Sequence, residues 1–359
     1  MKQKKKIILI FGTRPEAVKM APLVLALKKD KAFTTKVILT AQHRHMLDQV
    51  MELFKIKSDY DLNIMLQSQS LYHIASRALT GVGEILKKEK PDLILVHGDT
   101  STTLYAGIAG YYEKVPVGHV EAGLRSNDKH NPFPEEINRL LTDALCDLYF
   151  APTKSSKKNL IKENIDKDKI FITGNTVIDA LFHTAKTNHE SKLLKKIDKN
   201  KKLILATVHR RENWGSPLKN ICRAFNELAQ RSNAQFILPV HPNPLVKDTV
   251  HKMLGKNRNI ILVKPMDYID LVSVMKRAYI VLTDSGGIQE EAPALGKPVL
   301  VLRKVTERPE AVKAGTAKVI GTNTADITKN VEKLLKDKAF YTKMANAVNP
   351  YGDGKACAR

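Results

Sequence analysis

The chain has few cysteines, no long hydrophobic run and no excess of acidic residues, and each absence excludes a class of protein. Its three cysteines, Cys146, Cys222 and Cys357, are scattered and odd in number, which argues against a disulfide framework and a zinc site. No stretch approaches the roughly 20 apolar residues of a membrane span, and the apolar run near the N-terminus is too short for a signal peptide. We therefore predict a cytoplasmic protein without membrane insertion.

Acidic residues are outnumbered, with 37 Asp and Glu against 59 Lys and Arg, which gives a formal net charge of +22. Such a charge raises the possibility of a nucleic acid or an anionic membrane surface as a partner. The lysines are spread over many segments and do not form one stripe interleaved with aromatic residues, which favours solvated helix faces. We expect no nucleic-acid partner, and polyanion binding stays as an alternative.

The chain has 359 residues, 43% of them hydrophobic, which is more than a single hydrophobic core usually contains. This length indicates two domains. Continuous apolar runs alternate with segments of helical spacing, which is typical of parallel sheets covered by helices on both faces. A polar, lysine-rich stretch at residues 187–202 separates two such blocks. We predict an α/β fold of two doubly wound, Rossmann-like domains, residues 1–186 and 187–359, that face each other across a cleft.

Polar clusters follow the predicted strands, at the edge where ligands of open α/β sheets bind. The clusters are GTRPE at 12–16, HGDT at 97–100, HVEAG at 119–123, VHRREN at 208–213, PVHPN at 239–243 and TDSGG at 283–287. Any one of them could simply cap the end of a strand. Together, at the carboxyl edges of two sheets, they predict a binding cleft.

The segment TDSGGIQEE predicts a diphosphate site in the second block. Ser285, Gly286 and Gly287 lie where a strand meets a helix, so their backbone N–H groups and the positive helix end would face an anion. The two glycines would allow a diphosphate to approach the backbone closely. Glu291, one turn into the helix, could accept hydrogen bonds from ribose hydroxyls. The alternative is an ordinary glycine-rich turn.

Cations follow other strands. In GTRPEAVKMAP, Pro15 suits the first turn of a helix, so Arg14 and Lys19 would form a second anion-binding corner, unless they are a solvated cation pair. His209 and His241 end two strands of the second block, close to arginines. A lone histidine is more often structural, but a histidine beside arginines at this edge suits phosphate.

Carboxylates gather in the first block. Asp99 and Glu121 end two neighbouring strands, and Glu135 is followed by Arg139 on the same helix face. Acidic groups are costly to collect unless cations or protons compensate them, and such clusters tend to be functional. Glu135 and Arg139 alone could be an ordinary helix ion pair. No HExxH, Cys/His cluster or strand-borne GxGxxG is present, so we expect no metal and no nicotinamide cofactor.

Several motifs recur in order along the chain and together carry a resemblance. They are GTRPEAVKMAP, HGDT, HVEAGLR, NPFPEEINR, HRREN, VHPN, TDSGGIQEEAPALGKPVLVLR, TERPEAV, AGT and NPYGDGKA. In this set the chain closely resembles the non-hydrolysing bacterial UDP-N-acetylglucosamine 2-epimerases. The resemblance implies a fold of the glycosyltransferase-B type, a homodimer, no redox cofactor, and interconversion of UDP-N-acetylglucosamine and UDP-N-acetylmannosamine for surface polysaccharide synthesis.

The resemblance also implies a mechanism and roles. UDP leaves as the proton on carbon 2 is removed, which gives 2-acetamidoglucal, and UDP then adds back while carbon 2 is protonated on the opposite face. The implied catalytic residues are Asp99, Glu121, Glu135 and His209, without an assignment of acid and base. The implied substrate-binding residues are Arg14, Lys19, Arg139, Met266, Leu271, Ser285, Gly286, Gly287, Glu291 and Arg308, with uracil near Met266 and Leu271.

Some members of the family bind a second UDP-N-acetylglucosamine as an activator. The positions of this chain that match that site are Gln42, His43, Glu136, Arg210 and His241. The chain departs from the pattern at His45, where glutamine or glutamate is expected, and in LQSQS, which lacks an arginine. Met266 and Leu271 stand where relatives often carry glutamine and phenylalanine. The chain ends at YGDGKACAR, before a last helix expected to pack on the first domain.

Two other activities fit parts of the same pattern. A glycosyltransferase of the same fold would share the nucleotide-binding turn but would not need the ring of carboxylates. A hydrolysing 2-epimerase would release UDP and free N-acetylmannosamine. Both stay as alternatives at this stage.

Overall fold

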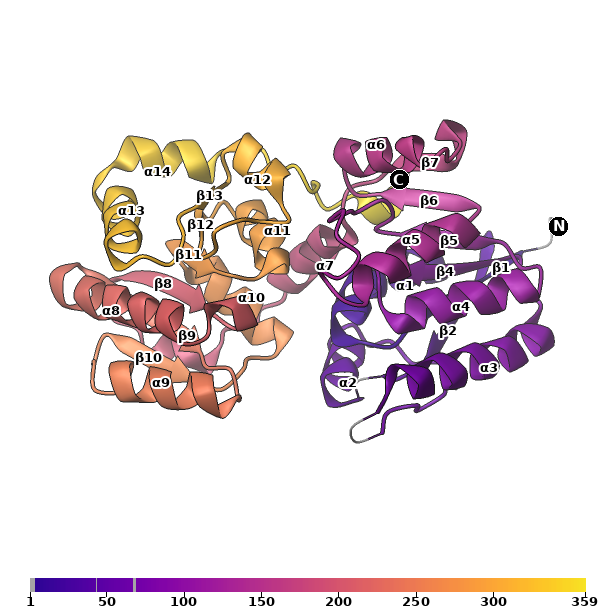
Figure 1. The fold of residues 1–359 in the computed structure, drawn as a ribbon, viewed down its shortest axis with the longest axis horizontal. Helices are drawn as coiled ribbons and strands as arrows, with labels where there is room; N and C mark the ends of the chain where they lie inside the picture. The colour runs from indigo at the N-terminus through magenta and orange to yellow at the C-terminus, as the bar shows by residue number, and fades with distance from the viewer. Residues whose placement is uncertain (1–3, 43, 67–68) are drawn as a thin grey trace. The chain divides into compact units, whose positions relative to one another are not determined.

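A computed structural model describes residues 4–42, 44–66 and 69–359, which form two compact units. Unit 1 contains Met1–Ala180 and Tyr351–Arg359, and unit 2 contains Leu181–Pro350. Each unit is built on one parallel sheet with helices packed against it (Figure 1). The predicted α/β class with two Rossmann-like units is confirmed.

Unit 1 has a seven-stranded sheet in the order β3-β2-β1-β4-β5-β6-β7. Its strands are β1 (Lys5–Phe11), β2 (Phe33–Leu39), β3 (Tyr60–Asp61), β4 (Leu93–His97), β5 (Val117–Val120), β6 (Leu148–Ala151) and β7 (Ile170–Ile172). Its helices are α1 (Arg14–Lys29), α2 (Arg44–Leu53), α3 (Leu71–Glu89), α4 (Ser101–Tyr112), α5 (Glu135–Leu145), α6 (Lys154–Lys162) and α7 (Thr176–Ala185), with short 3-10 turns at Lys167–Lys169 and Ala356–Ala358. Helix α7 continues into unit 2.

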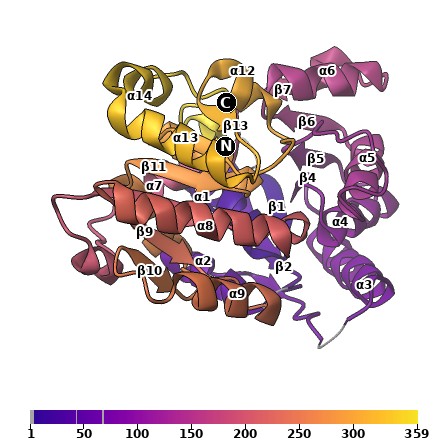
Figure 2. The same cartoon turned by 60° about the vertical axis from the view of Figure 1, so that its left-hand side comes forward.

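The core of unit 1 lies between the central strands and the helices that cover them. Ile8 and Ile10 of β1 and Val96 of β4 are fully buried, and Leu86 of α3 and Ala106 of α4 pack into the same cluster. Strands buried on both faces need continuous apolar runs, which is why these segments lack alternation. Helix α4 packs against both α3 and α5, as Figure 2 shows.

Unit 2 has a six-stranded parallel sheet in the order β10-β9-β8-β11-β12-β13. Its strands are β8 (Lys202–Thr207), β9 (Ala234–Pro239), β10 (Ile260–Val263), β11 (Ile280–Thr283), β12 (Val299–Val301) and β13 (Ala317–Val319). Its helices are α8 (Ser216–Arg231), α9 (Pro244–Leu254), α10 (Tyr268–Arg277), α11 (Gly286–Ala294), α12 (Pro309–Ala314), α13 (Thr324–Lys336) and α14 (Lys338–Ala345), with 3-10 turns at Lys192–Lys196 and Arg211–Asn213.

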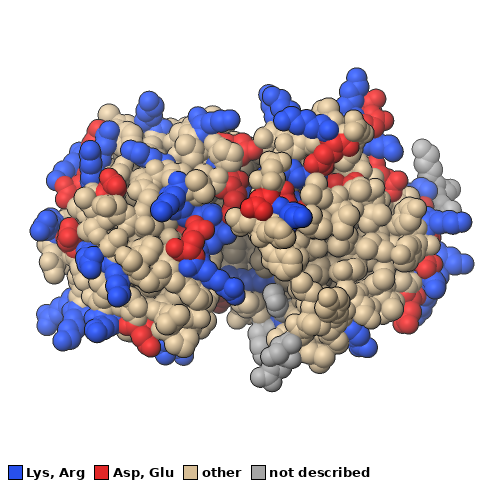
Figure 3. Space-filling view, viewed as in Figure 1, with Lys and Arg blue, Asp and Glu red and all other residues tan. Residues whose placement is uncertain are grey.

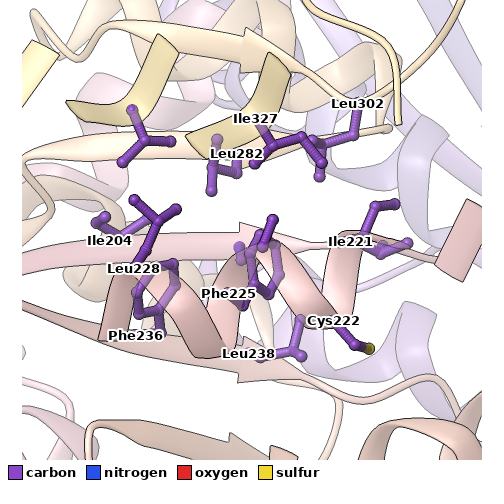
Figure 4. Close-up of a cluster of buried hydrophobic side chains, with 14 of the residues drawn as sticks. Ile204, Ile221, Cys222, Phe225, Leu228, Phe236, Leu238, Leu282, Leu302 and Ile327 are labelled. Carbon is purple, nitrogen blue, oxygen red and sulfur yellow. The ribbon is translucent and has the colours of Figure 1, made fainter. Parts of the chain in front are cut away.

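The core of unit 2 is formed where α8 packs on the sheet (Figure 4). Ile221, Phe225 and Leu228 are buried on one face of α8 and follow the spacing of an amphipathic helix. The ring of Phe225 lies 5.2 Å from that of Phe236 on β9, a distance typical of paired aromatic rings. The covered strands hold the polar segments at their ends in fixed positions.

The last residues of the chain belong to unit 1, whereas the sequence analysis placed residues 187–359 in the second domain. The N–H of Asn175 donates to the carbonyl of Tyr351 at 2.7 Å. The N–H groups of Ala356 and Cys357 donate to the Asp179 carboxylate, both at 3.1 Å. These bonds satisfy the backbone of the tail, so residues 351–359 pack as part of the first unit.

Lysine and arginine are dispersed over the surface of both units. On the face in view in Figure 3 they are interspersed with Asp and Glu and do not form one basic stripe. This distribution agrees with the solvated helix faces predicted from the sequence. Within the part of the chain that the structure describes, no helix has both the length and the apolar character needed to cross a membrane.

Candidate functional site

In unit 1, polar segments follow three neighbouring strands. Strand β1 lies beside β4, and β4 lies beside β5. The GTRPE, HGDT and HVEAG segments begin within or directly after these strands. Because all three strands are parallel, their carboxyl ends lie at one edge of the sheet, where ligands of this fold bind.

Glu121 is buried at this edge beside a lysine. Its Oε2 accepts hydrogen bonds from Lys19 Nζ and from Asn175 Nδ2, the latter at 2.6 Å. Its φ of +69° lies in the left-handed region, which non-glycine residues seldom adopt and which recurs at functional sites. The structure therefore brings together two predicted residues, Lys19 and Glu121. It adds Asn175, which no motif of the sequence singled out.

His97 is a buried neighbour of Glu121 that the site predictions did not include. Its Nε2 lies 3.8 Å from Glu121 Oε2, and neither ring nitrogen has a hydrogen-bond partner among the described residues. Burial lowers the pKa of His97 to about 3, so the ring is neutral at physiological pH. A neutral imidazole beside a carboxylate adds no positive charge, whereas Lys19 brings a cation into contact with Glu121.

Asp99 is held by an arginine of helix α5. Arg139 Nη2 donates to Asp99 Oδ2, and Arg139 Nη1 donates to Glu136 Oε2 at 2.8 Å. Glu136 is buried, and its Oε1 accepts from the N–H groups of Ser126 and Asn127, both at 2.9 Å. The chain of contacts orients the guanidinium, which in turn orients Asp99. The structure thus pairs two predicted residues directly, Asp99 with Arg139, and Glu136 holds the arginine in place.

Glu135 opens α5 one residue before Glu136. Its Oε2 is buried and has no hydrogen-bond partner among the described residues. A buried carboxylate oxygen is costly to leave unpaired, so this atom is available to a proton or a donor on a ligand. The structure gives no hydrogen bond or ion pair, in the part of the chain it describes, that joins Glu135 to Asp99 or Glu121.

Arg14 begins α1 directly after the turn that follows β1. The turn is held by Glu16, whose Oε2 accepts from the N–H groups of Gly12 at 3.1 Å and Thr13 at 2.7 Å. Glu16 Oε1 accepts from the Thr100 hydroxyl at 2.8 Å, which ties this turn to the HGDT turn. Although these hydrogen bonds oppose it, burial raises the pKa of Glu16. Glu16 is a structural partner of the site that the sequence analysis did not identify.

In unit 2, the central strands are ordered β9-β8-β11, so the segments with His241, His209 and Ser285 also meet at one edge. Asp284 is fully buried there. Its Oδ1 lies 2.9 Å from His209 Nδ1, and its Oδ2 accepts from the N–H groups of His209 and Arg210 at 2.9 Å. Burial opposes ionisation of Asp284, but these contacts lower its pKa. The predicted His209 is therefore oriented by a carboxylate.

Ser285 is the N-cap residue of α11, and the next two residues are the predicted glycines. A Cβ atom built on Gly286 would lie 3.6 Å from Glu307 Oε2 and 3.7 Å from Arg308 Nη2. Arg308, the N-cap residue of α12, donates through Nε to Oε1 of Glu290 on α11. The predicted arginine therefore lies against the predicted turn, so a cation and the helix start face the same anion position.

Glu307 is a further residue of this region that the sequence analysis missed. Arg210 Nη2 lies 3.2 Å from Glu307 Oε2, and Arg303 Nη1 lies 3.2 Å from Glu307 Oε1. Burial opposes ionisation of Glu307, but Arg210, Arg303 and Arg308 lower its pKa. An ionised Glu307 holds Arg210 and Arg303 in place, while Arg303 also pairs with Glu212 and Arg308 pairs with Glu290.

The residues expected to hold the nucleoside lie on two neighbouring helices. The Tyr268 hydroxyl donates to Glu291 Oε2 at 2.8 Å, which joins the start of α10 to α11. Leu271 lies on α10, and Met266 lies in the segment before that helix. Tyr268 was not predicted, because a tyrosine in PMDYIDL has an ordinary place in a helix core.

The residues matched to the activator site have these surroundings. Gln42 Oε1 accepts from the Thr102 hydroxyl at 3.2 Å, and Arg210 contacts Glu307. His241 Nδ1 accepts from the N–H of Asn243 at 3.2 Å. Glu136 holds Arg139, as described above. His43 lies outside the described residues, so the activator site stays a prediction.

Among the described residues there is no group of side chains suited to a metal ion, and the two buried cysteines are poor nucleophiles. Residues 4–42, 44–66 and 69–359 contain no group of three or more His, Cys, Asp or Glu side chains that could hold a metal ion. Cys146 and Cys222 are buried, and burial raises the pKa of the Cys222 thiol to about 12 and that of Cys146 well above its usual value. Such thiols are inert at physiological pH.

The chain is similar over nearly its whole length to several known proteins. The family model described as UDP-N-acetylglucosamine 2-epimerase matches residues 25–359. The chain is 52% identical to the UDP-N-acetylglucosamine 2-epimerase of Salmonella typhimurium, with 99% of this chain and 96% of that protein covered. It is 50% identical to the enzyme of that name from Bacillus subtilis, with 99% and 94% covered. The crystal structure of UDP-GlcNAc 2-epimerase from Neisseria meningitidis bound to UDP-GlcNAc matches with a TM-score of 0.90 and 49% identity, with 98% of this chain and 97% of that chain covered.

Proposed function

The chain belongs to the family of UDP-N-acetylglucosamine 2-epimerases, and we propose that it is a non-hydrolysing member. In this proposal it is an isomerase that interconverts UDP-N-acetylglucosamine and UDP-N-acetylmannosamine for cell-surface polysaccharide synthesis. The observation that carries the proposal is the pairing of Glu121 with Lys19 and of Asp99 with Arg139 at the ends of adjacent strands. These are two acid/base groups, each beside a cation.

The chemistry explains why such pairs are needed. Carbon 2 of the sugar has no neighbouring carbonyl, so the carbanion left by simple deprotonation would have no stabilisation. In the proposed reaction a base removes the proton on carbon 2 as the bond between carbon 1 and the phosphate oxygen breaks. The electron pair of the C–H bond forms the double bond of 2-acetamidoglucal, and the electrons of the C–O bond leave with UDP. The reverse step protonates carbon 2 on its other face.

Two carboxylates in different surroundings can divide this work. Glu121 is buried and contacts Lys19, whereas Asp99 is partly exposed and contacts Arg139. Each carboxylate therefore lies in contact with a cation, but at a different depth below the surface. Glu135, with its buried and unpaired Oε2, is the third candidate and could donate or accept a proton from its own direction.

Unit 2 supplies the groups that suit a departing diphosphate. The start of α11, Arg308 and His209 offer backbone N–H groups, a guanidinium and an imidazole. Preorganised donors of this kind stabilise charge that develops on a leaving group, commonly the largest catalytic contribution. Tyr268, with its bond to Glu291, would fix the carboxylate that meets the ribose.

Incubation with UDP-N-acetylglucosamine in heavy water tests the proposal. We expect deuterium at carbon 2 of both nucleotide sugars, in an equilibrium mixture that contains little free sugar. Accumulation of UDP and free N-acetylmannosamine would instead identify a hydrolysing epimerase. Absence of deuterium at carbon 2 would reject epimerisation and favour a glycosyltransferase that shares the nucleotide-binding turn.

We also propose a homodimer and a cytoplasmic location. Exposed apolar side chains on the adjacent helices α3, α4 and α5, with Tyr112 and Leu141 among them, support an interface with a second copy. Free cysteines support a reducing compartment. Analytical ultracentrifugation should give a dimer that Tyr112→Glu and Leu141→Glu dissociate. A monomeric wild-type protein at micromolar concentration would contradict the dimer.

A further inference from the structure

His119 has no role in the proposed reaction, yet it is fully buried at the centre of the site in unit 1. It lies on β5, two residues before Glu121. Its Nδ1 lies 2.6 Å from Asp143 Oδ1 on α5, and its Nε2 lies 2.7 Å from the carbonyl oxygen of Gly98. The ring therefore connects α5 to the turn that carries Asp99.

Both neighbours of the ring are acceptors. A backbone carbonyl cannot donate, so Nε2 must carry a proton. The Asp143 carboxylate already accepts from Arg125 Nη2 at 2.6 Å and from the N–H of Gly123 at 3.3 Å. The Arg125 guanidinium in direct contact with Asp143 stabilises the ionised form of this carboxylate. With an ionised Asp143, Nδ1 must also carry a proton, and the ring is an imidazolium.

The charges around the ring balance when it is cationic. Arg125 binds the Glu163 carboxylate through Nε at 2.7 Å and through Nη2 at 2.5 Å, in addition to Asp143. Two carboxylates then face one guanidinium and one imidazolium, which satisfies the requirement that buried charges be paired. The other titratable groups on the adjacent strands are His97 on β4, which is neutral, and Tyr149 on β6, whose hydroxyl donates to the Asp143 carbonyl.

The contact with Gly98 acts on a single peptide group. Gly98 has a φ of +70°, and its N–H donates to the Val120 carbonyl at 2.9 Å. Its carbonyl belongs to the peptide bond that leads directly into Asp99. A donor on this carbonyl fixes the plane of that peptide, and with it the direction in which the Asp99 side chain leaves the backbone. Arg139 then holds the carboxylate from the other side.

We propose that His119 is a positioning residue: a buried imidazolium, paired with Asp143, that clamps the Gly98 carbonyl and so holds Asp99 in its reactive orientation. The part that concerns catalysis rests on the proposed function. The charge state of the ring does not, and it can be tested separately.

Nitrogen NMR of the intact protein with 15N-labelled histidine tests the charge state without reference to activity. We expect both ring nitrogens of His119 to give the signals of protonated nitrogens at neutral pH, and the resonances to be assigned by their loss in His119→Gln. In Asp143→Asn the ring should become neutral, with the proton on Nε2. A single neutral tautomer in the wild-type protein would overturn the proposal, whether or not the enzyme is an epimerase.

Turnover measurements test the link to Asp99. Displacement of a reacting group by about 1 Å can cost on the order of 100-fold in rate, so His119→Phe should lower kcat about 100-fold with little change in KM. Asp143→Asn keeps the donor to Gly98 and should retain most of the activity. His119→Phe should add little to the loss caused by Asp99→Asn, because both act through one group.

The positioning role would be rejected if the double variant lost the full product of the two single-variant losses in kcat. It would also be rejected if a folded His119→Phe had an unchanged kcat. If His119→Phe does not fold, as circular dichroism would show, the same comparison is made with His119→Leu, which also lacks a donor to the Gly98 carbonyl. If the wild-type protein incorporates no deuterium at carbon 2, the proposed function fails, while the nitrogen spectra still decide the charge on His119.

Discussion

At the scale of single residues, Asp284 determines how His209 is presented. The Asp284 carboxylate is buried, and its Oδ2 accepts hydrogen bonds from the backbone N–H groups of residues 209 and 210. Its Oδ1 faces His209 Nδ1. The imidazole is about half exposed, which leaves Nε2 as the nitrogen that can serve a ligand. A buried carboxylate at this distance restricts the orientation of the imidazole ring. The sequence could not single out Asp284, because an aspartate in TDSGG is equally suited to a helix cap.

Asp284→Asn should therefore lower activity while the protein stays folded. The amide can still accept from the N–H groups of residues 209 and 210, but it no longer places a negative charge beside His209 Nδ1. Because misplacement of a reacting group by about 1 Å can cost on the order of 100-fold in rate, we expect a loss of about 10- to 100-fold. Steady-state kinetics should show this loss. Glu332→Gln, in an exposed helix pair with Lys336, is the control and should leave kcat/KM unchanged.

Glu89, which lies away from the site, is another buried carboxylate whose ionisation is set by its hydrogen-bond partners. It is buried at the end of α3, where its carboxylate accepts from Lys36 Nζ at 2.8 Å, from the Tyr60 hydroxyl and from Lys6 Nζ at 3.1 Å. The hydrogen bonds from Lys36 and Tyr60, with a smaller contribution from Lys6, lower the pKa of Glu89 to about 2. Its stabilising contribution is present above the pKa of the unfolded chain, near 4.3, and is lost as the pH falls toward about 2.

Glu89→Gln should thus destabilise the protein at neutral pH by about 1.5–3 kcal/mol, the range for a hydrogen bond to a charged group. The loss should shrink as the pH falls from about 4.5 to about 2, because the wild-type carboxylate is then protonated too. Urea unfolding at several pH values measures this. Glu113→Gln, which removes the 3.6 Å contact with an exposed Lys87, should cost less than about 1 kcal/mol. An equal loss at all pH values would contradict the assigned cause.

At the scale of elements, the junction of β1 and α1 depends on a close approach of three chain segments. A Cβ atom on Gly12 would lie 1.9 Å from Thr40 Oγ1 and 2.7 Å from Thr102 Oγ1. These hydroxyls, which follow β2 and begin α4, are hydrogen-bonded at 2.8 Å. The glycine of GTRPE is therefore needed for packing between segments, in addition to any approach by a ligand.

Gly12→Ala should destabilise unit 1 by about 1–3 kcal/mol, the usual cost of overpacking. Gly83→Ala is a matched control, because Gly83 lies within α3 and a Cβ atom there meets nothing within 4 Å. That substitution should stabilise by up to about 1 kcal/mol through helix propensity. Thermal unfolding of the two variants should move in opposite directions. A stable Gly12→Ala would show that Thr40 and Thr102 can move apart without cost.

At the scale of the whole molecule, the proposed function assigns proton transfer to unit 1 and diphosphate binding to unit 2. The two activities should then be separable by substitution. Gly286 offers a clean test, since an added Cβ would have its nearest neighbours at 3.6 Å and 3.7 Å, which is ordinary contact. The protein should tolerate this methyl group, but a diphosphate held against the backbone should not.

Gly286→Ala should weaken UDP binding at least about tenfold in isothermal titration calorimetry, about 1.4 kcal/mol, with an unchanged melting temperature. Glu121→Gln should abolish deuterium exchange at carbon 2 and keep UDP binding within a few-fold of wild type. If Gly286→Ala bound UDP with full affinity, the diphosphate would not lie against the start of α11.

The sequence alone determined the α/β class, because short continuous apolar runs such as residues 203–208 that alternate with segments of helical spacing are typical of a parallel sheet covered on both faces. It also placed the polar motifs at strand ends. It did not predict β3 or β13, since Tyr60–Asp61 has only two residues and a lysine interrupts Ala317–Val319, so neither strand shows an apolar run. It also did not predict the return of residues 351–359 to unit 1, which depends on hydrogen bonds with partners such as Asp179.

Only the tertiary structure decided which groups pair. Lys19 and Glu121 are separated by 102 positions and His119 and Asp143 by 24, and local sequence patterns carry no information about contacts over such separations. A motif identifies a residue that can carry charge. The protonation state and orientation of that residue depend on burial and on partners from other elements, which exist only after the chain has folded.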